Sequence, residues 1–269
     1  MPEPQLTLYH NGMSSSSQKV RLALAEKNLN WTGRPVSLRD GEHQQDWYRA
    51  LNARAVVPTL VDGAEAIQES TVINEYLEGK YPDHPLMPGD ELGKARVRLW
   101  TKQVDDTVHD GCIAVLAYAI AFRSALLENK DAAFKQLAQI PDVFKRERRR
   151  DVLTNGLESI HVKIAIGRMN KLFEDMDAAL AKSEWLTGDT YSLADLSIIP
   201  YVCRMADLTL LQMAENRSHV LAWFDRCKNR QSYADAITKW EDQGMLGMMK
   251  RAGEQHWPKV KDIWQEKTA

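Results

Sequence analysis

The pattern of apolar and polar positions changes several times within the first eighty residues. Segments of strand length and strand-type patterning occur at residues 6–9, 31–37, 59–61 and 66–68. Helical spacing of apolar residues occurs at 18–27 and again after Ser70, whose hydroxyl can cap a helix. The order strand, helix, strand, followed by strand, strand, helix, predicts a thioredoxin-like sheet of the α/β class.

A proline-rich stretch separates this part from the rest of the chain. Residues 81–89 contain three prolines and end in a glycine, all of them poor in a helix interior. Beyond this stretch the spacing is helical throughout, and helices are expected at 94–134, 157–182, 193–212, 219–229 and 232–252. The sequence therefore predicts a fold of α/β plus all-α class, with a thioredoxin-like domain at 1–83 and a helical domain at 90–269.

Composition and charge narrow the possible functions. The net charge of -2 gives no overall field that would attract nucleic acid, and the basic run 145–150 is expected to be a solvated helix face. No apolar run is expected to reach the roughly 18 residues of a membrane span, and no secretory signal is expected. The three cysteines and seven histidines show no metal-ligand spacing. We expect a reduced, cytoplasmic protein with no metal and with no nucleic-acid or membrane partner.

Four consecutive serines, residues 14–17, lie between the first expected strand and the first expected helix. In an α/β sheet, the loop that follows the carboxyl end of a strand faces the usual ligand crevice. A hydroxyl in this loop could donate a hydrogen bond to a thiolate and so lower the pKa of that thiol. The alternative is a plain N-terminal helix cap, which the serine run taken alone favours.

Two further pairs of residues could bind a small peptide. Val57 precedes Pro58 at the start of an expected strand, where a cis peptide bond would leave the Val57 backbone to pair with an extended ligand; an ordinary trans proline is the alternative. At the start of the next helix, Ser70 could hold a carboxylate and Glu69 could accept from an ammonium group; a helix cap with an acidic residue is the alternative. With the serine run, these pairs suit a zwitterionic peptide that carries a thiol.

Two other features have simpler interpretations. Ser192 and Asp195 form a capping box with aspartate in place of glutamate, which predicts the start of a buried helix. His43 lies in the loop ahead of Val57 and, taken alone, is interpreted as an exposed polar residue.

These features in this order resemble the soluble glutathione transferase family over nearly the whole chain. The resemblance is carried by SSSSQKVRLALAEK at 14–27, LNARAVVPTL at 51–60, ESTVINEYLE at 69–78 and TGDTYSLAD at 187–195. It implies glutathione as a co-substrate and a homodimeric assembly. It also implies that Ser14 is the thiol-activating serine, as in theta- and zeta-like members, while the serine run leaves Ser16 and Ser17 open for the same role.

The same resemblance implies roles for the remaining candidate residues. Val57 matches the residue whose backbone pairs with the cysteinyl unit of glutathione, ahead of a cis Pro58. Glu69 and Ser70 match the pair that holds the γ-glutamyl end. His43 falls where related enzymes contact the glycyl carboxylate. One position departs from the family, because Val56 stands where relatives often carry Lys or Gln.

A narrower resemblance is to the bacterial lignin β-aryl etherases of the F type. It is carried by ESTVINEYLE at 69–78, VRLWTKQVDD at 97–106 and the long insert that runs through IPDVFKRERRR at 140–150. It implies that a glutathione thiolate attacks the carbon beside a ketone of a hydrophobic aromatic substrate and releases a phenolate. The alternatives are a general conjugating or peroxide-reducing transferase and a catalytically idle glutathione-binding module. From position alone, candidates for the acceptor site are Met13, Trp47, Val108, Cys112 and Tyr118.

Overall fold

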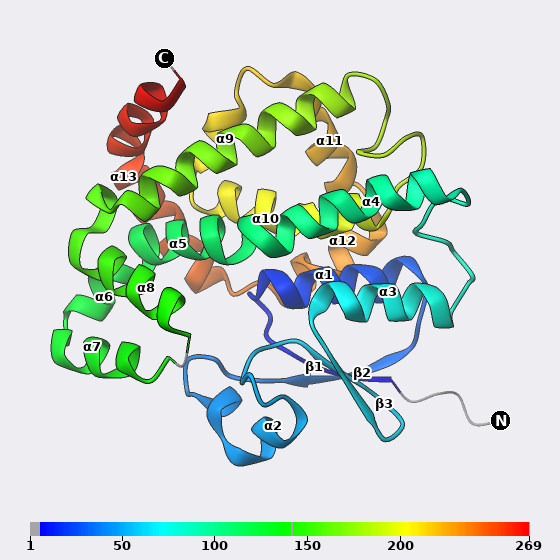
Figure 1. The fold of residues 1–269 in the computed structure, drawn as a ribbon, viewed down its shortest axis with the longest axis horizontal. Coiled ribbons are helices and arrows are strands. Elements are labelled where there is room, and N and C mark those ends of the chain that lie inside the picture. Colours follow the sequence, from blue (N-terminus) through cyan, green and yellow to red (C-terminus); the bar gives the residue numbers. More distant parts are fainter. Residues whose placement is uncertain (1–5, 141, 269) are drawn as a thin grey trace. The chain divides into compact units, whose positions relative to one another are not determined.

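The computed structural model describes residues 6–140 and 142–268 (Figure 1). The chain divides into two compact units. Unit 1 contains Met1–Thr101, Trp185–Pro200 and Asp225–Asp242, and unit 2 contains Lys102–Glu184, Tyr201–Phe224 and Gln243–Ala269. A four-stranded sheet is present in unit 1 and unit 2 is helical, so the predicted fold class is confirmed. The predicted domain boundary between residues 83 and 90 stays a prediction.

The sheet of unit 1 has the strand order β2-β1-β3-β4. β1 (Leu6–His10) pairs in parallel with β2 (Trp31–Pro35) and antiparallel with β3 (Thr59–Asp62), and β3 pairs antiparallel with β4 (Glu65–Gln68). Because side chains alternate along a strand, the even-numbered residues of β1 are buried on one face, whereas Thr7 and Tyr9 are half-buried on the other. The four predicted strands are thus confirmed.

Helices cover both faces of this sheet (Figure 1). α1 (Ser15–Glu26) and α3 (Ser70–Lys80) lie side by side on the face of His10, and Lys19 Nζ of α1 donates to Thr71 Oγ1 of α3 at 2.7 Å. On the other face, Tyr48 of α2 (Asp46–Leu51) packs against Tyr9. The sequence analysis missed α2 and the short turn η1 (Glu42–Gln44) before it, because a helix of six residues with one buried side chain is too short to show a period.

A buried carboxylate organises the segment from residue 185 to residue 195 in unit 1. Asp195 Oδ2 accepts hydrogen bonds from the backbone N–H of Ser192 at 3.1 Å and from its hydroxyl at 3.0 Å, while Oδ1 accepts from Leu186 N at 3.0 Å. The predicted capping box is therefore confirmed, and it begins α10 (Leu193–Asp207). Leu193 N also donates to Leu86 O at 2.9 Å, which fixes the linker that follows α3.

The helices of the second half differ from the prediction in several places. The helix expected at 193–212 ends at Asp207 and is followed by a separate short turn at 210–214, and α8 (Val143–Asn155) lies in none of the expected ranges. The helix expected at 94–134 is continuous only from Glu91 to Leu127. It is made of α4 (Glu91–Gln103), η2 (Val104–Ile113), α5 (Ala114–Ala117), η3 (Tyr118–Phe122) and α6 (Arg123–Leu127). Asn129 then caps a new helix by accepting from Ala132 N at 3.1 Å. The helix expected at 232–252 is three elements: α12 (Gln231–Ala236), η6 (Thr238–Trp240) and α13 (Gln243–Thr268). The others are α7 (Lys130–Ala138), η4 (Gly156–Glu158), α9 (Ile160–Leu180), η5 (Leu210–Ala214) and α11 (Ser218–Lys228).

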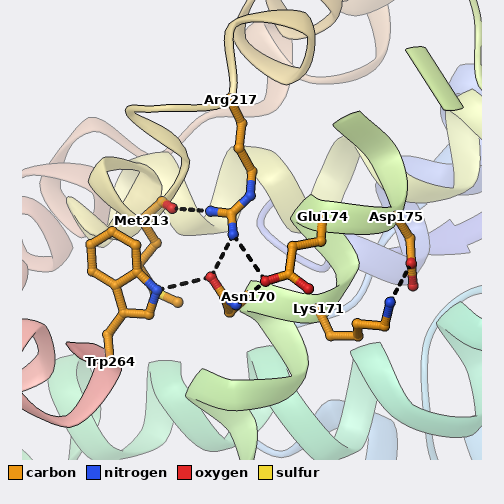
Figure 2. Close-up of polar contacts among 7 residues, drawn as sticks. All are labelled: Asn170, Lys171, Glu174, Asp175, Met213, Arg217 and Trp264. Carbon is orange, nitrogen blue, oxygen red and sulfur yellow. Dashed lines mark hydrogen bonds and ion pairs between the residues drawn. The ribbon is translucent and has the colours of Figure 1, made fainter. Parts of the chain in front are cut away.

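Polar contacts join three elements of unit 2 around one amide (Figure 2). The side-chain oxygen of Asn170 in α9 accepts from Trp264 Nε1 of α13 at 2.9 Å and from Arg217 Nη2 at 2.7 Å. Arg217, just ahead of α11, also donates to Met213 O at 2.7 Å and pairs with Glu174. The half-buried guanidinium thus fixes the end of η5 and the start of α11 to α9.

The basic run 145–150 lies on α8 with none of its residues buried, as predicted, but part of the run also meets an acidic residue. Lys145 Nζ and Arg148 Nη2 lie 3.2 and 3.9 Å from the carboxylate of Asp110, and Arg149 lies over the ring of Tyr118 at 5.6 Å. Burial raises the pKa of Asp110, but the neighbouring cations outweigh burial, so the pKa falls below its usual value. The charge run predicts a solvent-exposed helix face but not the opposite charge that the face meets.

The expectation that no segment is apolar enough to span a membrane was also wrong. The stretch Glu91–Leu127 is long and apolar enough by length and composition, with a mean hydropathy of 1.6 in an 18-residue window. Of that window, 44% is buried inside the protein. The core helices of soluble proteins pass the same test, so this one helix is weak evidence for a membrane span.

Removing the Asp195 carboxylate is expected to destabilise the fold strongly. In Asp195→Ala the three donors from Leu186 and Ser192 lose their acceptor in a fully buried place, and we expect the free energy of unfolding to fall by about 2–4 kcal/mol. Urea denaturation measures this change. The matched control Asp189→Ala, at an exposed position six residues away, should stay within about 0.5 kcal/mol of the unaltered protein. Equal losses in the two variants would contradict this account of the capping box.

Candidate functional site

The strand register brings three of the predicted site segments to one edge of the sheet. Tyr9 is opposite Thr59, and Thr59 is opposite Gln68. Because β1 and β4 run antiparallel to β3, the end of β1, the start of β3 and the end of β4 lie at the same edge. We call residues 10–14, 57–59 and 68–70 the site edge. The serine run begins there, next to Val57-Pro58 and Glu69-Ser70.

Two helices begin at this edge. α1 starts at Ser15 and α3 starts at Ser70, and the bond between Lys19 and Thr71 holds their first turns together. The first backbone N–H groups of a helix have no partner within the helix, and its dipole is positive at this end. The site edge is therefore favourable for an anionic group such as a carboxylate or a thiolate.

The hydroxyls of the serine run have different surroundings. Ser14 has extended backbone geometry, and its Oγ accepts from Ser17 N at 3.3 Å, so the N-cap interpretation is correct for this residue. Ser17 is fully buried, and its own Oγ accepts from Asn11 N at 3.3 Å. Ser16 is half-buried on the first turn of α1. Accepting one hydrogen bond leaves the hydroxyl proton of Ser14 able to donate.

The loop before β3 is fixed by hydrogen bonds from α2 and from the residue that ends this helix. The peptide bond between Val57 and Pro58 is cis, as predicted. The carbonyl of Val56 accepts from Tyr48 Oη at 2.7 Å and from Asn52 Nδ2 at 2.9 Å. The same two side chains also contact Thr59 Oγ1, at 3.0 and 3.1 Å. Tyr48 and Asn52 therefore fix both sides of the cis peptide; the sequence analysis missed them along with α2.

Glu69 has an unusual backbone conformation at the third segment. Its φ of 67° lies in the left-handed region, which non-glycine residues rarely adopt and which occurs often at ligand sites. Its carboxylate pairs with Arg54, a residue that the sequence analysis did not single out. Both side chains are exposed, so this pair contributes little to stability and leaves the carboxylate oxygens accessible to solvent.

Of the other predicted residues, Met13 belongs to the site edge, and the rest lie outside it. His43 is half-buried in η1, where its Nε2 lies 3.4 Å from Gln44 Nε2, and burial lowers its pKa. Of the five acceptor-site candidates, Met13 and Trp47 belong to unit 1, and Val108, Cys112 and Tyr118 belong to unit 2. Burial raises the pKa of the Cys112 thiol to about 12, so this cysteine is an inert core residue at neutral pH. Within residues 6–140 and 142–268, no three acidic, His or Cys side chains gather to bind a metal.

A buried cation lies directly behind the serine run. Arg21 of α1 is 1% exposed and donates to the carbonyls of Gly12 and Ala236 at 2.7 Å, to that of Asn11 at 3.1 Å, and to His10 Nδ1 at 3.1 Å. Because arginine has no acceptor, Nδ1 accepts and the His10 ring is neutral. Burial, together with the charge of Arg21, lowers the pKa of His10 to about 4. The sequence analysis missed both residues, because neither stands out from its strand or helix.

Comparison with known proteins shows to which protein family this chain belongs. The chain matches the model of the glutathione S-transferase N-terminal domain at residues 13–80 and that of the C-terminal domain at residues 156–231. Together these matches span more than half of the chain. The protein belongs to the glutathione transferase superfamily.

Among individual relatives, the protein LigF of Sphingobium sp. strain SYK-6 is 27% identical over 257 residues, covering 90% of this chain and 96% of LigF. The crystal structure of the β-etherase LigF has a TM-score of 0.78 and 25% identity, and covers 87% of this chain and 99% of that chain. A maleylacetoacetate isomerase of Pseudomonas aeruginosa is 47% identical over 96 residues, covering 35% of this chain and 45% of that protein.

The low pKa of His10 predicts a loss of stability in mild acid. The unfolded chain binds a proton near pH 6.5, whereas the folded protein does so only near pH 4. The stability is therefore complete above pH 6.5 and falls as the pH drops from 6.5 to about 4, by about 3 kcal/mol from this residue. His10→Gln keeps an acceptor for Arg21 and removes the titration. Urea denaturation from pH 7 to pH 4 should give a steeper loss for the unaltered protein; parallel curves would contradict the neutral, buried His10.

Proposed function

We propose that the site edge binds glutathione and that Ser14 donates a hydrogen bond to its sulfur. The observation that carries this proposal is the double use of one hydroxyl. Its oxygen accepts from Ser17 N and so holds the hydroxyl at the start of α1, while its proton is left to donate. A donor at a helix N-terminus favours the thiolate over the thiol and lowers the thiol pKa. Membership of the glutathione transferase superfamily supports the choice of glutathione.

The other candidate residues would hold the rest of the peptide. The backbone of Val57, ahead of cis Pro58, would pair with the cysteinyl unit in the manner of an added strand. The hydroxyl and N–H of Ser70 at the start of α3 would hold the γ-glutamyl carboxylate, and the exposed carboxylate of Glu69 would meet the ammonium group. His43 would contact the glycyl carboxylate. Of the four serines, Ser17 is the least suited to the sulfur, because its side chain is fully buried.

The likeness to LigF supports a narrower proposal, cleavage of β-aryl ethers in lignin-derived aromatic ketones. The thiolate attacks the carbon next to the ketone, a carbon–sulfur bond forms, and the carbon–oxygen bond breaks. The phenolate leaves with the electron pair. The adjacent ketone already activates this carbon, so the protein supplies orientation and a deprotonated sulfur. The homodimer, the cytoplasmic location and the hydrophobic acceptor site are part of this proposal.

Exchange of Ser14 tests the assignment of the thiol-activating hydroxyl. Ser14→Gly removes the donor, and glycine is a fair helix N-cap, so the stability should fall by only a few tenths of a kcal/mol. We expect kcat/KM to fall by about 100-fold or more and the acidic limb of its pH profile to move to higher pH. Ser14→Thr keeps both the cap and the donor and should retain most of the activity.

The matched control is Ser16→Ala, which removes a half-buried hydroxyl two positions further along α1. This variant should have the pH profile of the unaltered protein. Loss of activity in Ser16→Ala together with an active Ser14→Gly would move the assignment to Ser16.

The substrate class is tested by a β-aryl ether ketone that carries a fluorescent phenol. We expect fluorescence to increase only when glutathione is present, with one phenol released for each glutathione consumed. A chlorinated nitrobenzene and an organic peroxide, offered in parallel, test the general transferase and the peroxidase. Turnover of either compound without phenol release would contradict the etherase proposal and leave the general transferase. Glutathione binding without turnover of any of the three would favour the idle binding module.

A further inference from the structure

We propose that Arg21 is a positioning residue for the serine run, and that it acts with the segment Ala236–Asp242 to fix the backbone ahead of Ser14. This inference rests on the proposed role of Ser14. It assigns a task to a buried arginine and to a segment more than 210 residues away from it in the sequence, both of which lie in unit 1.

Arg21 and Ser14 are linked through one shared carbonyl. Nη1 of Arg21 donates to Asn11 O at 3.1 Å, and Ser14 N donates to the same carbonyl at 3.3 Å. Nη2 donates to Gly12 O at 2.7 Å, so the guanidinium holds two consecutive carbonyls of the loop. The side chain of Asn11 completes the turn by accepting from Met13 N at 3.1 Å. The position of Ser14 therefore depends on a backbone that Arg21 holds.

The other side of the guanidinium contacts the end of α12 and an aromatic ring. Arg21 Nε donates at 2.7 Å to the carbonyl of Ala236, the last residue of α12. The ring of Trp240 lies 5.3 Å from the guanidinium carbon and stands perpendicular to the His10 ring at a centroid distance of 4.5 Å. The guanidinium is thus held between the loop, the end of α12 and an aromatic face, and this arrangement limits its movement.

The backbone of Trp240 also lies close to the loop itself. A Cβ built on Gly12 would lie 2.6 Å from the backbone oxygen of Trp240, closer than real Cβ atoms come. The neighbouring Asp242 N lies 3.4 Å from the sulfur of Met13. Glycine at position 12 is therefore required by contact with the backbone of η6, and residues 11–13 are held between Arg21 and the segment Ala236–Asp242.

The acceptors around Arg21 carry no charge to balance that of the guanidinium. All four hydrogen-bond partners of Arg21 are neutral, and among the described residues no carboxylate forms an ion pair with it. Burial lowers its pKa to about 9, which still leaves the guanidinium charged at neutral pH. A buried charge needs its hydrogen bonds, so the carbonyls of Asn11, Gly12 and Ala236 are kept in place by desolvation as well as by geometry.

The experiment compares two Gly→Ala variants. Gly12→Ala pushes the loop away from the Trp240 backbone, whereas a Cβ on Gly79 of α3 meets nothing within 4 Å. For each protein, the thiolate absorbance of bound glutathione is followed against pH, together with kcat, KM for glutathione and denaturation by urea. We expect Gly12→Ala to raise the thiol pKa by about one unit and to lower kcat at pH 7 about tenfold, with a smaller change in KM. Gly79→Ala should leave the thiol pKa, kcat and KM for glutathione unchanged.

Arg21→Lys separates geometry from charge. Lysine keeps the positive charge but cannot donate to three carbonyls in the fixed geometry of a guanidinium. We expect the thiol pKa to rise in this variant as well; if Arg21→Lys does not fold, Gly12→Ala alone decides. A loss of stability in Gly12→Ala with an unchanged thiol pKa would overturn the positioning role, as would an unchanged thiol pKa in folded Arg21→Lys. If the unaltered protein itself fails to lower the thiol pKa, the proposed role of Ser14 is wrong in the first place.

Discussion

The antiparallel pairing of β3 with both β1 and β4 is the constraint on which the site depends. It places the end of β1, the start of β3 and the end of β4 at one edge, although β1 is far from the other two strands in sequence. A shift of one residue in the register would turn every side chain of the strand to the other face. His10 would then leave Arg21, and Tyr9 would leave Tyr48. The hydrogen-bonded register thus specifies at once the core on both faces and the ligand segments at the edge.

A single hydroxyl can serve both structure and chemistry at this edge. The sequence analysis set a helix cap against a thiol-activating serine at the start of α1, and the geometry of Ser14 makes the two compatible, because the cap uses the oxygen and a donor uses the proton. The cap also fixes the orientation of the hydroxyl group. A serine in a flexible loop would lose entropy on adopting that orientation. Stability and preorganisation therefore depend on the same residue.

Much of unit 1 could be predicted from local signals. The strands, α1, α3 and the capping box of Asp195 each have a short-range pattern, whereas the cis peptide before Pro58 was implied only by the family resemblance. What could not be predicted depends on contacts between distant segments. The charge of Arg21 suggests an exposed residue, yet it is buried because carbonyls from residues 11, 12 and 236 converge on it. The partner of the basic run 145–150 could not be predicted for the same reason, since Asp110 lies more than thirty residues away.

The most direct test of the account is the protonation state of glutathione bound to the unaltered protein. Glutathione labelled with carbon-13 at the cysteinyl Cβ reports the ionisation of its own sulfur by NMR, with no substrate and no variant needed. We predict a titration midpoint at least one pH unit below that of free glutathione in the same buffer. Saturable binding with a midpoint equal to that of free glutathione would contradict the claim that this site activates a thiol.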